Sequence, residues 1–300
     1  MSFKNALKNL IAHFGTVWAL LLYMLLFAAL ITGLSLPFVL PIIRVFAKEG
    51  ILEQYGSAFS ALFGDGGWNG MWDGLFESYS STVALFGSND TVVTLTMLFV
   101  ILIAVFAFRF FLGLHEIPLA TVIDGKMSCN ARYGLGGKFF STLPVSVRYS
   151  LAKMLVTSII DAAIFAVIYG VGVAVGMSVI LPFLIILLLS VLMSFRFSLL
   201  ACWAPCVVDG YGVIKGFAMS VKICFKRFGS IYSTYFVSFV LLLALGAFVT
   251  VFTLGVGLII VLPVVETYIG YLDMTEYYNK TGKRYYVDEV VFTPAKDNVL

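Results

Sequence analysis

The stretch FRFSLLACWAPCVVDGYGVIKGFAMSVKICFKRFG, residues 195–229, recurs in pieces elsewhere in the chain. Its first half returns at 108–125 as FRFFLGLHEIPLATVIDG: both copies begin with Phe-Arg-Phe, place a proline ten residues later and end in Val-Asp-Gly or Ile-Asp-Gly. Its second half, together with the residues that follow, matches LKNLIAHFGTVW at 7–18, with a lysine and the pair Phe-Gly in register. The repeat predicts an architecture assembled from copies of one unit.

The composition excludes a water-soluble protein. Hydrophobic residues make up 61% of the 300 residues and charged residues 12%, with a mean hydropathy of +1.03. A soluble domain has roughly 25% charged residues. The apolar residues also form uncharged blocks of about 18 or more, which is the length needed to cross a bilayer as a helix. We therefore expect an all-α polytopic membrane protein.

The apolar blocks predict six transmembrane helices, at about 15–36, 91–111, 153–172, 177–197, 230–252 and 256–274. The stretch GLSLPFVLP, 33–41, predicts a turn after the first span. In each of the last two pairs of spans, the second helix is expected to begin just before a Leu-Pro step, at Leu181-Pro182 and Leu262-Pro263. Proline costs little in the first turn of a helix, because its missing N–H has no partner there.

Six spans taken in pairs make three two-helix hairpins. A unit with an even number of crossings re-enters the membrane in the same direction, so the repeats are expected to be parallel, in a quasi-threefold arrangement. The predicted domains are a six-helix membrane domain over 1–277, with hairpins 1–125, 126–210 and 211–277 and an extracytoplasmic insertion at 44–90, and a cytoplasmic tail over 278–300. Interfacial amphipathic helices complete the expected fold.

The distribution of Lys and Arg predicts the orientation, because basic residues are enriched on the cytoplasmic side. The segment 44–90 carries two basic and six acidic residues. The other side holds most of the basic residues: Lys4, Lys8, Lys126, Arg132, Lys138, Arg148, Lys153, Lys215, Lys222, Lys226 and Arg227. We expect both termini in the cytoplasm. The net charge of +3 is no argument for nucleic acid as a partner, because these cations are segregated by membrane side.

Two segments predict helices at the membrane surface. In 213–229 apolar residues recur at helical spacing beside Lys215, Lys222, Lys226 and Arg227, so these cations are expected to face anionic lipid headgroups. This segment is an interfacial linker in one interpretation and a specific lipid or partner site in the other. The insertion 44–90 predicts two short amphipathic helices on the outer surface, with Trp68 and Trp72 as anchors. A cap over a cavity, or a docking surface for a membrane-protein partner, is the alternative.

Ionisable residues inside the spans are the candidates for a functional centre. Asp161 and Glu266 are surrounded by apolar residues, and a carboxyl group in hydrocarbon needs a partner, water or a proton. Arg109 and Arg196 are equivalent positions of the repeat, near the cytoplasmic ends of their spans. One hypothesis is a polar centre in which Asp161 or Glu266 pairs with an arginine or takes up a proton. The alternatives are a single interhelical hydrogen bond that fixes packing, and arginines that reach the headgroups.

No catalytic motif is present, so we expect neither an enzyme nor a cofactor. All four cysteines, Cys129, Cys202, Cys206 and Cys224, fall on the predicted cytoplasmic side, where a disulfide framework is not expected. Four converging thiolates would make a zinc site, but C-x3-C is not the usual zinc spacing. Buried apolar cysteines are the simpler interpretation.

The steps APCVVDG and IPLATVIDG, each followed by a basic segment, resemble a loose group of uncharacterised bacterial six-helix membrane proteins. They are also similar to the membrane domain fused to some glycerophosphodiester phosphodiesterases. The resemblance covers about 1–274 and implies a bacterial plasma-membrane protein linked to lipids or the envelope. It carries over no catalytic residue, because the phosphodiesterase domain is absent from this sequence.

Two functional hypotheses follow from these observations. The first is a transport protein that handles a small molecule or lipid through a polar centre near Asp161 and Glu266. The second is a scaffold or accessory subunit that docks partners through the 44–90 segment and the cytoplasmic amphipathic helices.

Overall fold

The computed structural model describes residues 2–61, 64, 67–88, 91–129, 134–175, 180–253 and 255–283. Within them the chain forms helices joined by turns, and no strand is found there. The helices are α1 (Ser2–Ala12), α2 (Gly15–Lys48), α3 (Ile51–Ala61), α4 (Gly67–Ser88), α5 (Thr91–Gly113), α6 (Glu116–Cys129), α7 (Leu135–Val175), α8 (Leu181–Leu200), α9 (Trp203–Val208), α10 (Val213–Lys226), α11 (Phe228–Phe252) and α12 (Leu258–Thr281).

Six stretches of the described chain are long and apolar enough to cross a membrane. They are Gly15–Pro37, Val105–Ser128, Leu135–Val175, Phe183–Val208, Phe228–Phe252 and Leu258–Thr281. Many of their apolar side chains face outward, among them Ile159, Phe248 and Val251. The prediction of an all-α chain with six helices long and apolar enough to span a membrane is confirmed for the described residues.

The chain divides into two compact units. The main unit comprises Met1–Leu25 and Arg109–Leu300, and the insertion unit comprises Leu26–Phe108. The predicted insertion 44–90 falls within the insertion unit.

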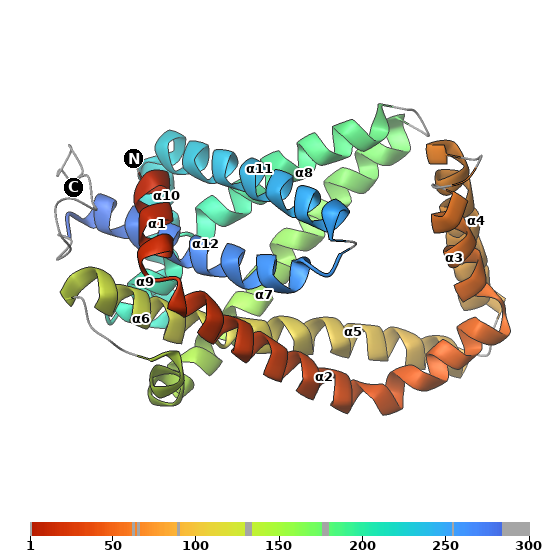
Figure 1. Cartoon of the computed structure of the whole chain (residues 1–300), viewed down its shortest axis with the longest axis horizontal. Helices are drawn as coiled ribbons and strands as arrows, with labels where there is room; N and C mark the ends of the chain where they lie inside the picture. The colour runs from red at the N-terminus through yellow and green to blue at the C-terminus, as the bar shows by residue number, and fades with distance from the viewer. Residues whose placement is uncertain are drawn as a thin grey trace. The chain divides into compact units, whose positions relative to one another are not determined.

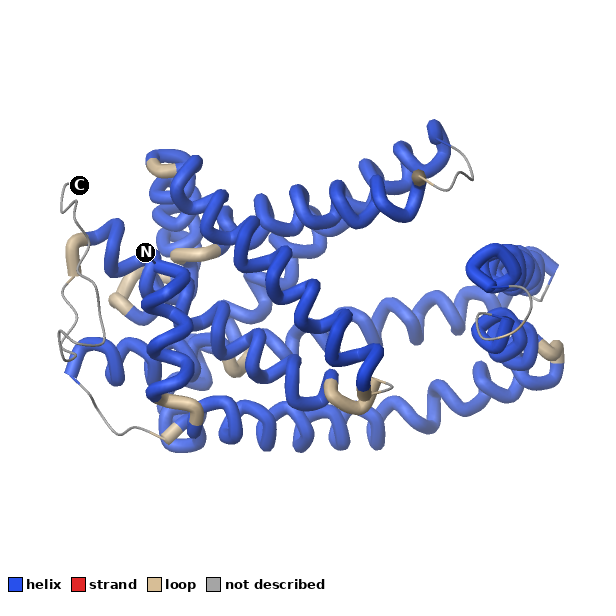
Figure 2. The backbone as a smooth tube through the Cα atoms, turned by 45° about the horizontal axis from the view of Figure 1, so that its top comes forward, coloured by secondary structure: helices blue, strands red, loops and turns tan. Residues whose placement is uncertain are grey.

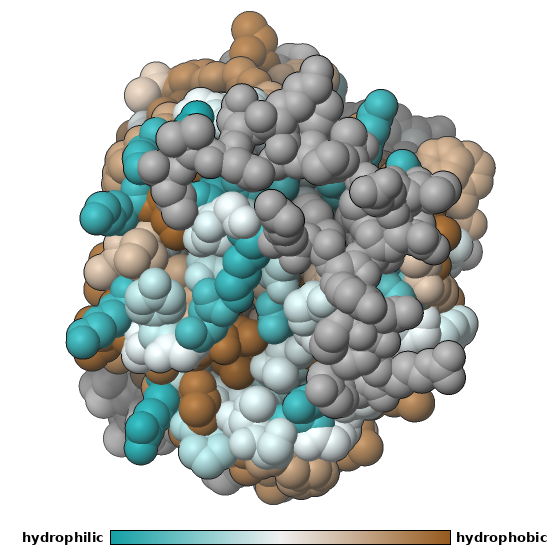
Figure 3. Space-filling view, turned by 90° about the vertical axis from the view of Figure 1, so that its left-hand side faces the viewer, coloured by the Kyte–Doolittle hydropathy of each residue, from teal (hydrophilic) through white to brown (hydrophobic). Residues whose placement is uncertain are grey.

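In the main unit, short helices cover one end of a bundle of long ones (Figures 1 and 2). At this end α1 packs on α12, α6 packs on α7 and α9, and α10 packs on α9. Trp203 of α9 is buried between Tyr149 and Phe217, and its indole N–H donates a hydrogen bond to the carbonyl of Val213 at 2.8 Å. The buried apolar core of the unit thus lies largely where the short helices meet the long ones, and hydrophilic side chains gather on the outer face of this end (Figure 3).

The two longest helices differ from the prediction. The expected turn at 33–41 is wrong, because α2 continues through Pro37 and Pro41 to Lys48. Each proline removes one backbone hydrogen bond, but unwinding the segment would leave several backbone groups unpaired, which is costlier in an apolar environment. The span predicted at 153–172 is the central part of α7, which begins at Leu135 and contains Pro144.

The prolines of the last two hairpins occupy different positions. The prediction for α8 is confirmed, because this helix begins at Leu181 with a proline in its first turn. For α12 the prediction is wrong: the helix begins at Leu258, and Pro263 lies inside it. This helix also continues to Thr281, beyond position 278 at which the tail was expected to begin. The remainder of the predicted tail, 284–300, lies outside the described residues.

In the insertion unit α3 packs closely against α4. A Cβ atom at Gly74 would lie 2.8 Å from the Cβ of Ala58, so only glycine allows this approach. The hydroxyls of Tyr55 and Thr82 form a hydrogen bond of 3.2 Å between the two helices. Large apolar side chains point away from this contact, and Trp72, Phe59, Phe76, Tyr79 and Val83 are exposed within the unit. The side chain of Trp68, the other predicted anchor, lies outside the described residues.

Candidate functional site

A cavity of about 580 Å³ lies within the main unit. Its wall is formed by the end of α5 and by α6, α7, α8, α9 and α12. The acidic and basic side chains on the wall are Arg109, Glu116, Lys153, Asp161, Arg196, Glu266 and Asp273. A volume of this size is typical of a small-molecule site, for which roughly 300–1,000 Å³ is usual.

Close helix packing shapes two sides of this cavity. At Gly113, near the end of α5, a Cβ atom would lie 2.5 Å from the hydroxyl oxygen of Ser150 on α7. That hydroxyl donates a hydrogen bond of 2.6 Å to the carbonyl of Phe110. At Gly270 of α12 a Cβ atom would lie 3.0 Å from the side chain of Ile123 on α6. The missing side chains let α5 approach α7, and α12 approach α6, along the cavity wall.

Asp161 of α7 binds both repeated arginines. One carboxylate oxygen lies 2.7 Å from Nε of Arg196 on α8, and the other lies 2.9 Å from Nη1 of Arg109 on α5. The exposed fractions are 16% for Arg196, 22% for Asp161 and 35% for Arg109. These charges are largely withdrawn from solvent, so each depends on the others for compensation.

A second pair of charged side chains lies about two helical turns away from Asp161 along α7. Lys153 forms an ion pair with Glu116 at the start of α6. Tyr149 donates a hydrogen bond of 3.1 Å to the same carboxylate oxygen of Glu116. Lys153 and Glu116 therefore neutralise one another at the cavity wall.

Two further carboxyl groups come from α12. Asp273 accepts a hydrogen bond from the hydroxyl of Tyr235 on α11. Glu266 lines the cavity and makes no hydrogen bond or ion pair with the part of the chain that the structure describes. Because the two residues are seven positions apart, they lie on the same face of α12. Two carboxyl groups on this face of α12 therefore line the cavity without forming an ion pair with any cation of its wall.

The structure brings together the four residues that the sequence singled out. Asp161, Glu266, Arg109 and Arg196 line one cavity, although they come from four different helices. The arginines pair with Asp161, and Glu266 stands apart from that cluster. Arg109 and Arg196 each stand in the middle of a Phe-Arg-Phe sequence.

Sequence reasoning missed three of the cavity's ionisable residues. Lys153 and Glu116 lie at the edges of apolar blocks, where charged residues are usually assigned to the headgroup region. Asp273 was placed at the end of the last span. Its spacing from Glu266 was the available signal, because acidic residues seven apart on one helix share a face.

The Asp-Gly steps of the repeat meet at two neighbouring tyrosines of α12. Tyr278 donates a hydrogen bond of 2.7 Å to Asp124, and Tyr277 donates one of 2.5 Å to Asp209. Lys283 forms an ion pair with Asp209. These bonds attach α6 and the end of α9 to the final turns of α12.

The predicted lipid-facing cations lie on or next to α10. Lys215, Lys222, Lys226 and Arg227 are exposed in the main unit. Ile214 is also exposed, whereas Gly216, Ser220 and Ile223 are buried against the unit. The hydroxyl of Ser220 donates a hydrogen bond of 3.0 Å to the carbonyl of Leu199, which holds α10 against the end of α8.

Two groups outside the candidate spans have shifted pKa values. Burial, together with the nearby charge of Lys126, lowers the pKa of His13, which stacks on Tyr271. Burial raises the pKa of the Cys224 thiol to about 11, so this side chain is neutral near pH 7. Cys202, Cys206 and Cys224 are buried, and the described residues contain no group of three or more His, Cys, Asp or Glu that could hold a metal ion. The side chain of Cys129 lies outside the described residues.

Comparisons with protein-family models, with curated proteins and with solved structures gave no match to this chain.

Proposed function

We propose that this chain is a transport protein of the membrane that handles a small molecule or a lipid, and that the cavity is its binding site. One observation carries the proposal: seven acidic or basic side chains and many apolar ones line a single cavity among the candidate spans. Placing charged groups in apolar surroundings is costly, and the groups found there commonly mark a pathway for a substrate or ion.

The arrangement of the wall suits an amphiphilic ligand. Along α7 the lining side chains change from Tyr149, Lys153 and Asp161 to Ile164 and Phe165. A polar head would lie at the first group and an apolar tail at the second. Phe165 lines the cavity while 68% of its own surface is exposed, so the apolar end is the more open one within the main unit. A ligand that partitions into the bilayer is expected to enter there.

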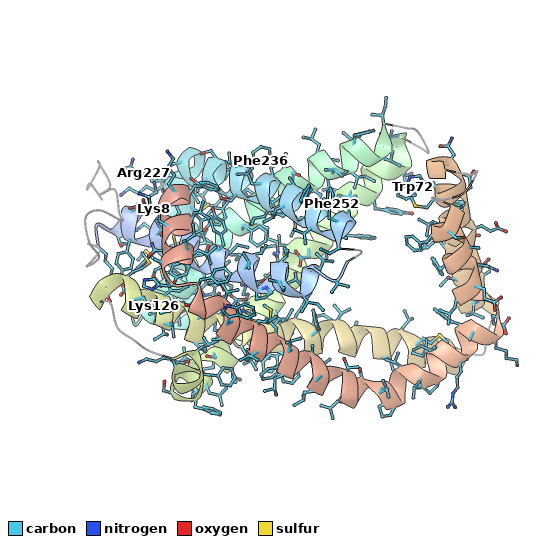
Figure 4. All side chains as sticks on the ribbon, in the orientation of Figure 1. Lys8, Trp72, Lys126, Arg227, Phe236 and Phe252 are labelled. Carbon is cyan, nitrogen blue, oxygen red and sulfur yellow. The ribbon has the colours of Figure 1, made fainter. Side chains whose placement is uncertain are left out.

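We also propose that the bundle consists of three parallel hairpin repeats with both termini in the cytoplasm of a bacterium and the spans in its plasma membrane. The shared acceptor of Arg109 and Arg196 and the paired tyrosine contacts of Asp124 and Asp209 support the repeat. Lys8, Lys126 and Arg227 lie at one end of the main unit and Phe252 lies at the other, which supports the orientation (Figure 4). In this topology α10 rests on anionic headgroups.

A scaffold function is the second candidate, and one observation favours it. Trp72, Phe76, Tyr79 and Val83 form an exposed stripe along α4 within the insertion unit. Contiguous apolar surface of this kind is typical of a membrane or protein contact. In this alternative the stripe docks a membrane-protein partner, and the function requires no ligand in the cavity.

Mass spectrometry of molecules that co-purify with the protein tests the two candidates. Leu189 lines the cavity, whereas Leu187 on the same helix is exposed and lies outside the cavity wall. The Leu189→Trp variant fills the cavity, and Leu187→Trp is its matched control. We expect wild type and Leu187→Trp to retain a stoichiometric amphiphile or small molecule that Leu189→Trp loses. Equal retention in all three proteins, or none in any, would argue for the scaffold.

A further inference from the structure

We infer that the ligand of this cavity is a cation: an organic ammonium compound with an apolar body. The inference rests on the proposed binding function of the cavity and specifies the chemistry of its ligand. It follows from which charges on the wall are already compensated and which are left available.

The cations of the wall have partners. Arg109 and Arg196 share Asp161, and Lys153 pairs with Glu116. An anionic ligand could approach Arg109 and Arg196 without displacing Asp161, because the two guanidinium groups share one carboxylate. It would then lie beside the carboxylate of Asp161, in a wall that also carries Glu116, Glu266 and Asp273, and repulsion from these groups would oppose its binding.

The carboxyl groups of α12 are in a different position. Glu266 has no hydrogen bond or ion pair among the described residues, and Asp273 has only the hydroxyl of Tyr235. The wall carries four carboxyl groups, Glu116, Asp161, Glu266 and Asp273, against three basic groups, so with all seven groups ionised it has one negative charge in excess. An ammonium group at Glu266 would balance the wall and supply the donors that this carboxyl lacks.

The rest of the wall fits the apolar part of such a ligand. Met193 and Phe197 of α8 and Ile164 and Phe165 of α7 line the same cavity as Glu266. Aromatic faces also attract an ammonium group, which adds to the preference for a cation. The expected ligand therefore has a positively charged nitrogen near α12 and an alkyl or aryl body toward the apolar side chains of α7 and α8.

Calorimetric titration of the full chain in nanodiscs of zwitterionic lipid tests this inference, with empty nanodiscs subtracted. The probes are decylammonium, decanoate and decanol, which share a tail and differ in charge. We expect decylammonium to bind at least about tenfold more tightly than the other two, a difference of about 1.4 kcal/mol. Glu266→Gln should remove that preference. Glu77→Gln, at an exposed carboxyl of α4, should keep it.

The Leu189→Trp variant separates failure of the inference from failure of the function. If all three probes bind equally, Glu266→Gln changes nothing and Leu189→Trp abolishes binding, the cavity binds amphiphiles but the cation preference is wrong. If no probe binds, or if Leu189→Trp leaves binding intact, both the inference and the proposed function are overturned. The inference is supported if wild type and Glu77→Gln prefer decylammonium and Glu266→Gln does not.

Discussion

Replacing Asp161 by asparagine should destabilise the main unit substantially. Oδ1 of Asp161 lies 2.7 Å from Nε of Arg196, and Oδ2 lies 2.9 Å from Nη1 of Arg109 and accepts a hydrogen bond of 3.4 Å from Nη2 of Arg196. The Asp161→Asn change keeps one acceptor, removes the negative charge and turns an N–H donor toward one of the arginines. Two cations would then remain in the cavity wall without a direct counter-ion.

The magnitude follows from the burial of the three side chains. Removing one partner of a buried ion pair costs roughly 3–5 kcal/mol. Solvent reaches these groups to some extent, since 16% of Arg196 and 35% of Arg109 is exposed. Screening lowers the expected cost to about 2–3 kcal/mol. For a chain of this size that corresponds to a fall in apparent Tm of roughly 4–10 °C.

Thermal unfolding of the purified protein in detergent is the assay. Ile159→Val, at an exposed position of the same helix, is the control and should change the Tm by less than about 2 °C. A triple variant with leucine at 109, 161 and 196 should recover most of the lost stability, because apolar residues often replace a buried ion cluster without penalty. An unchanged Tm in Asp161→Asn, or a triple variant as unstable as the single one, would refute the reasoning.

Three further predictions concern other contacts of the main unit. Gly113→Ala should lower the free energy of unfolding by about 1–3 kcal/mol, because its Cβ would displace the Ser150 hydroxyl. In the same melting assay, the double variant Gly113→Ala, Ser150→Ala should be more stable than Gly113→Ala alone, because the clashing hydroxyl is removed. Tyr278→Phe should lower the free energy of unfolding by about 1–3 kcal/mol, because it leaves the carboxylate of Asp124 without its hydroxyl donor. Hydrogen exchange of the α6 amides should then become faster, and unchanged exchange rates would contradict this prediction. The lowered pKa of His13 means that the unfolded chain binds more protons than the folded chain as the pH falls through about 6.5. Wild type should therefore lose stability on acidification from pH 7, and His13→Gln should lose less; parallel Tm–pH curves for the two proteins would contradict this prediction.

The sequence predicts the class of fold well, because hydrophobic length is a local property. Helix α11 ends at Phe252, as expected from its apolar block, and α2 begins at Gly15. The sequence is less informative about proline. Pro37 and Pro41 suggest a turn in isolation, yet whether a helix unwinds there depends on what else can satisfy its backbone, which local sequence does not record.

For the candidate site, the sequence predicts which residues belong to it better than it predicts which residues pair with one another. Asp161 and Glu266 were conspicuous because acidic residues are costly in an apolar span. That Asp161 binds two arginines, while Glu266 binds none, depends on how α5, α7, α8 and α12 are placed around the cavity. Lys153 and Glu116 were overlooked for the same reason: a charge at the end of a span can face the headgroups or the bundle, and only the packing decides which.

Accessibility of a single cysteine in the cavity tests the central claim most directly. In a background with the native cysteines replaced by alanine, Met193→Cys places a thiol on the cavity wall, and Leu187→Cys places one on an exposed face of the same helix. A membrane-impermeant thiol reagent should label Met193→Cys, and decylammonium should slow this reaction, while Leu187→Cys in the bilayer stays unlabelled. Trp72→Cys, at an exposed position of α4, is the positive control. Labelling of Trp72→Cys without any labelling of Met193→Cys would contradict an accessible binding cavity.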